Sequence, residues 1–368
     1  MIPSGVCVVE MRTVPLGVPQ GINGICGNKL HVENTFNELR WNPLLGTWVV
    51  VASRRAVRPW RSVEKCPFCP GAEETGFGWD VIVLDNKYPA LTPDAVASRE
   101  SNDIYIVKEG YGYAKVVVET PEHEGDLDSL PFENLVKYIK VLSQLTSRYC
   151  SDPRIEYVFP FRNKGEAVGV SLTHPHSQVY ILPFVPPRVS REYSMMQAHR
   201  EKRGTCLLCD ILKLEEAERV RMLYANDDFK AFLPFFAMWP YEVHVYPGRH
   251  VETLAQLSEG EVENLADALR MVTAAYNRLF DSSLPYMMVF HQKPCRGYEG
   301  FHLHVEFYPV NRSADKLKYP ASIEWGGWVF TYDSLPEQKA SELRKALEKA
   351  FLDLEKGSEK PRGRVCRP

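Results

Sequence analysis

The residues best suited to chemistry lie in the segment from Asn163 to Gln178, which reads NKGEAVGVSLTHPHSQ. Successive side chains of an extended strand alternate between its faces, so His174, His176 and Gln178 are expected to share one face. A neutral imidazole can attack phosphorus near pH 7, and a covalent histidine intermediate divides one group transfer into two steps. The segment therefore predicts chemistry on a phosphate that depends on its histidines.

Two glycines in the same segment, Gly165 and Gly169, allow tight turns that bring backbone amides close to an anion. The segment matches neither GxxxxGK[ST] nor GxGxxG, the two common phosphate-loop patterns. We expect His176 to be the nucleophile, with its other ring nitrogen protonated and oriented by an acceptor. Gln178 can donate a hydrogen bond to a phosphate oxygen as charge develops there. The alternative is a structural or merely exposed His176.

A metal site is indicated by Cys66 and Cys69, whose CxxC spacing suits tetrahedral zinc. Alone, the pair is equally compatible with a redox motif or two unrelated buried thiols. His123 and His174 complete a set of two thiolates and two imidazoles, which fills a structural zinc site and leaves no open position. Assigning His174 to the metal leaves His176 for catalysis.

The same order of features recurs in the second half of the chain, where the matching set is Cys206, Cys209, His250 and His302. His302 lies 128 residues after His174, and His250 lies 127 residues after His123. Nearly equal offsets indicate a tandem duplication, and hence a second zinc ion. The alternative is a site formed by Glu192, His291, His302 and His304, and His302 cannot serve both sites.

The pattern of elements predicts an α+β protein built from two tandem repeats, each an antiparallel sheet with a flanking helix. Expected elements include strands at 47–52 and 155–161, and helices at 132–149, 261–279 and from Leu335 to about Lys356. We divide the chain into an N-terminal extension (1–36), a catalytic repeat (37–190), a second repeat (191–355) and a tail expected to be disordered (356–368).

Composition limits the class of protein. The chain has 368 residues, of which 45% are hydrophobic, and this is enough to bury two cores of ordinary size. Its net charge of -3 argues against a general nucleic-acid or membrane binder. No secretory signal or membrane span is recognisable, so we expect a cytoplasmic protein. Cys7, Cys26, Cys150, Cys295 and Cys366 have no assignable metal role.

The segment 163–178 resembles the active-site segment of the galactose-1-phosphate uridylyltransferase family, in the histidine-triad superfamily, in its Asn-Lys-Gly start and His-Pro-His-x-Gln end. The blocks RWNPLLGTWVVVASRRAVRPW, FFAMWPYEVHVYPGRHV, LPYMMVFHQKP and FHLHVEFYP resemble the same family. The resemblance covers about residues 38 to 330. It implies an enzyme of galactose metabolism that works on nucleotide sugars and hexose 1-phosphates.

By this resemblance, His176 takes the uridylyl group from UDP-glucose, and galactose 1-phosphate then takes it to form UDP-galactose. The implied substrate contacts are Asn163, Ser171 and Gln178 at the phosphates, Arg55 and Arg58 near the nucleotide or sugar phosphate, Asn86 and Tyr88 at the uridine, and Lys318, Tyr319, Ile323 and Glu324 at the hexose. The family supplies the last group from the other subunit, so a homodimer with a composite site is implied.

Some positions depart from the family. Ser177 replaces a usual glycine, and Lys87 replaces an aspartate beside the expected uridine site. The second CxxC resembles a plant adenylyltransferase relative with two zinc ions, while the Glu192 set matches another metal site of the family, where iron is possible. Two alternatives to uridylyl transfer remain: transfer of adenylyl groups by an ADP-sugar or dinucleoside-polyphosphate phosphorylase, and a zinc-knuckle module that binds nucleic acid.

Overall fold

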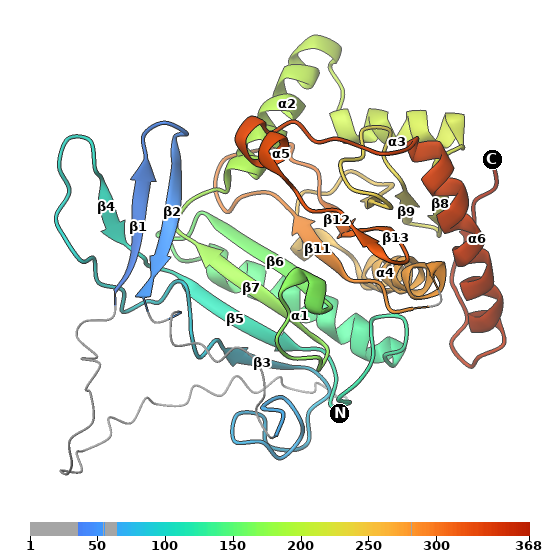
Figure 1. Ribbon diagram of the computed structural model, residues 1–368, viewed down its shortest axis with the longest axis horizontal. Coiled ribbons are helices and arrows are strands. Elements are labelled where there is room, and N and C mark those ends of the chain that lie inside the picture. The colour runs from blue at the N-terminus through green and yellow to red at the C-terminus, as the bar shows by residue number, and fades with distance from the viewer. Residues whose placement is uncertain (1–35, 54, 56–64, 281) are drawn as a thin grey trace, which may run out of the picture.

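The computed structural model describes residues 36–53, 55, 65–280 and 282–368. Its centre is one ten-stranded, antiparallel sheet with the strand order β15-β8-β9-β10-β12-β11-β6-β7-β5-β3 (Figure 1). The strands are β3 (Ile82–Asp85), β5 (Tyr113–Val118), β6 (Tyr157–Lys164), β7 (His176–Leu182), β8 (Met222–Ala225), β9 (Phe229–Phe232), β10 (Val243–Pro247), β11 (Tyr286–His291), β12 (His304–Pro309) and β15 (Arg364–Val365). The predicted α+β class is confirmed.

The sheet shows the duplication directly. The order β3-β5-β7-β6 in the first half is mirrored by β9-β10-β12-β11 in the second, and the two halves join where β6 pairs antiparallel with β11. Asn163 lies opposite Met287 at this joint. Strand β7, which begins at His176, therefore corresponds to β12, which begins at His304.

The long helices pack on the sheet because each carries an apolar stripe. In α1 (Phe132–Cys150) this stripe consists of Leu135, Ile139, Leu142 and Leu145, all of which are buried. Helix α4 (Glu259–Leu279) begins with a capping box in which Ser258 and Glu261 satisfy each other's backbone amides. Both helices contribute to the largest hydrophobic cluster, together with α6 (Pro336–Glu355). The three predicted helices are confirmed to within about two residues at each end.

Smaller elements surround this core. A separate three-stranded sheet has the order β2-β1-β4, formed by β1 (Asn37–Asn42), β2 (Thr47–Ala52) and β4 (Val107–Glu109). Helices α2 (Pro187–Arg203) and α3 (Leu207–Glu218) connect the repeats, and β13 (Asn311–Ser313), β14 (Lys316–Leu317) and α5 (Ser322–Gly327) follow β12. Within the described ranges, none of the helices combines the length and apolarity needed to cross a membrane.

The C-terminal tail is ordered, which corrects the expectation of disorder for 356–368. Strand β15 pairs with β8, and Arg362 forms an ion pair with Glu263 at 2.7 Å. A Cβ atom on Gly363 would lie 2.3 Å from the carbonyl oxygen of Ala225, so only glycine permits this close approach. The charged composition misled the prediction, because Glu359 and Arg362 have specific partners in α1 and α4.

A disulfide joins Cys150, at the end of α1, to Cys295, after β11, and so links the two repeats. Reducing it is expected to lower the free energy of unfolding by about 3–5 kcal/mol, because the unfolded chain loses a long covalent loop. Thermal unfolding with and without a non-chelating phosphine reductant measures this effect, and thiol titration in denaturant should reveal two additional thiols after reduction. The double variant Cys150→Ser, Cys295→Ser is the control. If the reductant lowers its unfolding midpoint as much as that of the wild type, the prediction is contradicted.

Candidate functional site

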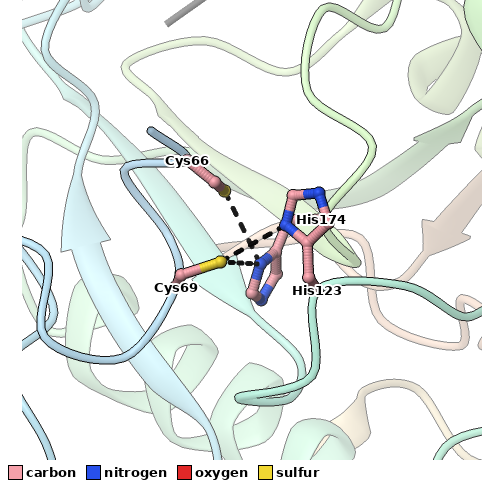
Figure 2. Close-up of side chains that lie close together, drawn as sticks. All are labelled: Cys66, Cys69, His123 and His174. Atoms are coloured by element: carbon pink, nitrogen blue, oxygen red, sulfur yellow. Dashed lines mark hydrogen bonds between the residues drawn. The ribbon is translucent and has the colours of Figure 1, made fainter. Parts of the chain in front are cut away.

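The four residues of the first predicted metal set lie together. Figure 2 shows Cys66 and Cys69 on one loop facing the rings of His123 and His174. The Sγ atom of Cys69 lies 3.3 Å from Nδ1 of His123 and 3.7 Å from Nδ1 of His174. Tetrahedral zinc with ordinary Zn–S and Zn–N bonds would place such ligand atoms about 3.6 Å apart. The geometry fits a structural zinc ion.

The chemistry of this ligand set agrees with its geometry. Burial lowers the pKa of His174, so its ring is neutral and able to bind a metal at pH 7. The Nε2 atom of His174 donates a hydrogen bond of 2.8 Å to the carbonyl of Thr120, which directs Nδ1 towards the cysteines. One sequence expectation is wrong here: His174 precedes β7, so it does not share a strand face with His176.

The second predicted set is also assembled. The Sγ atoms of Cys206 and Cys209 lie 3.4 and 3.5 Å from Nδ1 of His302, and Cys209 lies 3.8 Å from Nδ1 of His250. Hydrogen bonding with Cys209, and then with His302, lowers the pKa of Cys206 to about 3, which favours the thiolate that a metal requires. Unlike His174, His302 has a buried Nε2 with no hydrogen-bond partner among the described residues.

A third set of possible ligands consists of Glu192, His291, His304 and Glu306. The carboxylate Oε2 of Glu192 lies 2.9 Å from Nδ1 of His291, yet both atoms are buried without a hydrogen-bond partner in the described chain. Such orphaned atoms fit a divalent cation, for which carboxylate and imidazole are suitable ligands. Glu306 takes the place that we had given to His302, so the expected competition for His302 does not arise.

His176 begins β7 beside a cavity of about 580 Å³. Its Nδ1 donates a hydrogen bond of 2.8 Å to the carbonyl of His174, so Nε2 carries the lone pair that attack on phosphorus requires. The acceptor that a nucleophilic histidine needs is thus the backbone of the metal-binding residue itself. Gln178 lies two residues further along β7, on the same face as His176.

The segment between β6 and β7, residues 165–175, carries Gly165 and Gly169 and is called the glycine loop here. It forms one wall of the cavity. Asn163, Gly165 and Ser171 line it together with His176. Gly165 and Gly169 flank a short 3-10 turn with φ of 93° and 79°, values in the left-handed region that glycine adopts without strain. The predicted phosphate-binding residues of the loop and the predicted nucleophile are therefore brought together.

Three other predicted substrate contacts, Arg55, Asn86 and Tyr88, are absent from the lining of this cavity. Arg55 donates a hydrogen bond of 3.0 Å to the hydroxyl of Tyr180, which shares a face of β7 with Gln178. Asn86 and Tyr88 form a turn after β3, in which the Asn86 side chain accepts a hydrogen bond from the Tyr88 amide. Arg58 lies outside the described residues.

The predicted hexose segment does not line the cavity of its own chain. Lys318 is buried, and its Nζ donates a hydrogen bond of 2.7 Å to the carbonyl of Met238. Glu324 accepts hydrogen bonds from Ala321 and Thr331, so both charged members serve the local fold. Tyr319 and Ile323 are exposed and available for contact with another molecule.

Three residues near the site escaped the sequence interpretation. Phe68, between the cysteines of the first metal loop, packs its ring 5.2 Å from that of His176. Tyr180 continues the alternation of His176 and Gln178, which was a usable signal. Glu306 occupies the position of Gln178 in the second repeat, and the pattern HxHxE could have identified it as a ligand.

A buried network of hydrogen bonds and ion pairs holds β7 in place through Ser177. The guanidinium of Arg162 donates from Nε to both carboxylate oxygens of Glu119 and from NH1 to Asp126. Ser177 donates to Glu119 and is 2.9 Å from the Tyr138 hydroxyl. Although burial alone would raise it, the charges of Arg162 and Lys164 hold the pKa of Asp126 below its usual value. Ser177, at a departure from the family pattern, thus anchors the strand beside His176.

Replacing Arg162 by methionine is expected to destabilise the protein by about 3–5 kcal/mol, because the buried Glu119 loses its countercharge and Asp126 keeps only that of Lys164. Chemical denaturation measures the change. Lys137→Met, which breaks an exposed pair with Asp80, is the matched control and should cost less than about 1 kcal/mol. Equal losses in the two variants would contradict the role given to the buried network.

Family models for galactose-1-phosphate uridyl transferase match the chain in two parts: the N-terminal domain over residues 29–186 and the C-terminal domain over 191–352. The galactose-1-phosphate uridylyltransferase of Thermotoga maritima is 39% identical over 313 residues, which cover 83% of this chain and 98% of the relative. That of Haemophilus influenzae is 33% identical over 331 residues, covering 83% and 93%.

The fold gives the same result. A solved uridylyltransferase structure superposes with a TM-score of 0.80 at 42% identity, covering 85% of this chain and 99% of the other. Both domain models match in order, and the matched residues include the histidine strand and all the ligands of the three candidate metal sets. The chain therefore belongs to the galactose-1-phosphate uridylyltransferase family.

Proposed function

We propose that this enzyme transfers a uridylyl group from UDP-glucose to galactose 1-phosphate through a covalent intermediate on His176. The observation that carries the proposal is the position of His176 beside the cavity, with Nδ1 bonded to the carbonyl of His174. The products are glucose 1-phosphate and UDP-galactose, which places the reaction in galactose metabolism. A cytoplasmic location remains a prediction.

In the first step, the lone pair on Nε2 of His176 attacks the α-phosphorus of UDP-glucose. A nitrogen–phosphorus bond forms, and the bond from this phosphorus to the bridging oxygen breaks, releasing glucose 1-phosphate. The imidazole ring then carries a positive charge, which strengthens its hydrogen bond to the His174 carbonyl. In the second step, a phosphate oxygen of galactose 1-phosphate attacks the same phosphorus and the nitrogen leaves.

Residues around His176 are suited to the charge on the phosphates. Gln178 can donate to a non-bridging oxygen, and the loop that carries Gly169 and Ser171 can present further donors from the side of Ser171, which lines the cavity. Arg55, positioned by Tyr180, adds a positive charge at the same strand face. These are assignments of role, and Asn86 and Tyr88 are assigned to the base.

The two Cys₂His₂ sets are assigned to zinc, and the set with Glu192 and Glu306 to a further divalent ion, for which iron is a candidate. All three are proposed to hold structure. The first is coupled to catalysis because His174 supplies the carbonyl that orients His176. Elemental analysis of the purified enzyme, with Cys209→Ser and Glu192→Gln variants, assigns the ions to the sites.

Radiolabelled UDP-glucose tests the reaction. With the label in the uridylyl phosphate, we expect an acid-labile, base-stable label on the protein that galactose 1-phosphate removes. ADP-glucose labelled at the equivalent phosphate is the control. Labelling by ADP-glucose alone would replace uridylyl by adenylyl transfer, and labelling by neither would refute the covalent intermediate.

We assign the hexose contacts of Tyr319 and Ile323 to the neighbouring subunit of a homodimer. The surrounding segment exposes Trp325, Trp328 and Val329, an apolar surface that suits a protein interface. These residues are absent from the lining of the chain's own cavity. A composite site explains both observations.

Mixing two inactive variants tests this arrangement. His176→Ala lacks the nucleophile, and Tyr319→Ala with Ile323→Ala lacks the exposed hexose contacts. If subunits exchange at random, half of the dimers are hybrids with one intact site, so we expect about a quarter of the wild-type activity. Each variant alone should remain inactive or nearly so. A mixture no more active than the mean of its components would show that each site is completed by its own chain.

A further inference from the structure

A second cavity, of about 490 Å³, lies where the C-terminal tail docks on the second repeat. Its lining consists of Glu216, Arg219, Met222, Ala225, Lys230, Arg364, Val365, Cys366 and Arg367. The tail strand β15 forms one edge of the ten-stranded sheet, and β7 lies near the other edge. The C-terminus and β8 are accordingly far from the glycine loop in Figure 1. This cavity is separate from the histidine site.

Positive charge dominates the cavity, because three arginines and a lysine face a single carboxylate, Glu216. Lys230 donates a hydrogen bond of 2.7 Å from Nζ to the carbonyl of Asn226. Arg219, Arg364 and Arg367 form no ion pair with any residue whose placement the structure describes. Guanidinium groups that line one cavity and outnumber its carboxylates favour a doubly or triply charged anion.

The backbone holds these cations in place. Arg219 caps α3 with φ of 63°, a left-handed conformation in which glycine is usual. Gly363 lets the tail approach Ala225, and the Cys366 amide donates a hydrogen bond of 2.8 Å to the carbonyl of Leu223. The backbone on which Arg364 and Arg367 stand is thereby held against β8.

The match to the C-terminal family model ends at residue 352, so the tail lies outside the matched residues. Four of the nine lining residues, from Arg364 to Arg367, belong to this unmatched tail. None of the nine is among the residues assigned to uridylyl transfer.

We propose that this cavity binds a small molecule with a diphosphate or triphosphate group. The arginines would form forked hydrogen bonds to phosphate oxygens, as guanidinium groups do, while Met222, Ala225 and Val365 offer an apolar surface to the rest of the molecule. A volume of about 490 Å³ lies within the usual range for sites that bind small molecules. The proposal is independent of the uridylyl-transfer assignment.

Isothermal titration of the full-length enzyme with inorganic pyrophosphate tests this proposal. The double variant Arg364→Gln, Arg367→Gln is expected to lose roughly tenfold or more in affinity at one site per chain, because two charge-assisted contacts are removed. Arg219→Gly provides a second variant: it removes a cation at a backbone position that favours glycine, so it should bind pyrophosphate more weakly while remaining as stable as the wild type.

The matched control is Lys202→Gln, Arg203→Gln, which removes the same charge from the exposed end of α2. It should bind pyrophosphate like the wild type. The wild type and the three variants share the histidine site, so binding of pyrophosphate there does not distinguish them. The Arg364, Arg367 double variant should also retain wild-type transferase activity, which shows that it folds. Unchanged affinity in that variant, or an equal loss in the control, would overturn the proposal.

Discussion

Replacing His176 by alanine is expected to abolish uridylyl transfer, lowering kcat by on the order of 10⁴-fold or more, as removal of an enzymatic nucleophile does. The covalent label from UDP-glucose should disappear with it. The side chain is half-buried at the edge of a cavity, so its removal should change the free energy of unfolding little. Enzyme assays measure kcat, labelling measures the covalent intermediate, and chemical denaturation measures the free energy of unfolding.

Gln178→Ala is the matched variant, because it removes a neighbouring polar side chain from the same face of β7. We expect a loss of kcat of about 10²–10³-fold, which corresponds to one donor to a developing negative charge. The covalent label should still form, more slowly. Equal labelling in His176→Ala and the wild type would refute the assignment of the nucleophile.

Replacing Cys69 by serine is expected to release one metal ion per chain and to destabilise the protein by roughly 4 kcal/mol or more, as loss of a structural metal does. Activity should fall as well. Phe68, on the same loop as Cys69, packs against His176, and the backbone carbonyl of the ligand His174 orients the ring of His176. Metal analysis, denaturation and kcat measured on one preparation check the three effects.

Cys209→Ser in the second repeat provides the control. It should also release a metal ion, but the ring that corresponds to His176 there is His304, which the proposed reaction does not use. We therefore expect stability to fall while kcat changes less than about tenfold, since the first repeat is intact. A loss of activity as large as that of Cys69→Ser would contradict the division of labour between the repeats.

The sequence predicted most of the site because its signals are local or repeated. CxxC spacing predicts two ligands at once, and the duplication indicates which histidines accompany them. Alternation along β7 was correct for His176 and Gln178 but wrong for His174, because the chain bends at His174 before the strand begins. The alternation of side chains, with its period of two residues, does not show at which residue a strand starts.

Long-range partners could not be predicted. Cys150 and Cys295 are 145 residues apart, and spacing carries no signal for such a pair. The order of the tail depends on Gly363 meeting Ala225, and composition alone favoured disorder.

The pairing of β6 with β11 has a consequence for the origin of the molecule. These strands are equivalent in the two repeats and run antiparallel, which is the relation that a two-fold axis imposes on two copies of one chain. A single-repeat ancestor could thus have assembled through the same strand edge as a dimer. Duplication of its gene and fusion of the two copies would have made that association independent of protein concentration and left no exposed edge at the joint. Once linked, one copy was free to lose its nucleophile's function while still completing the sheet for the other.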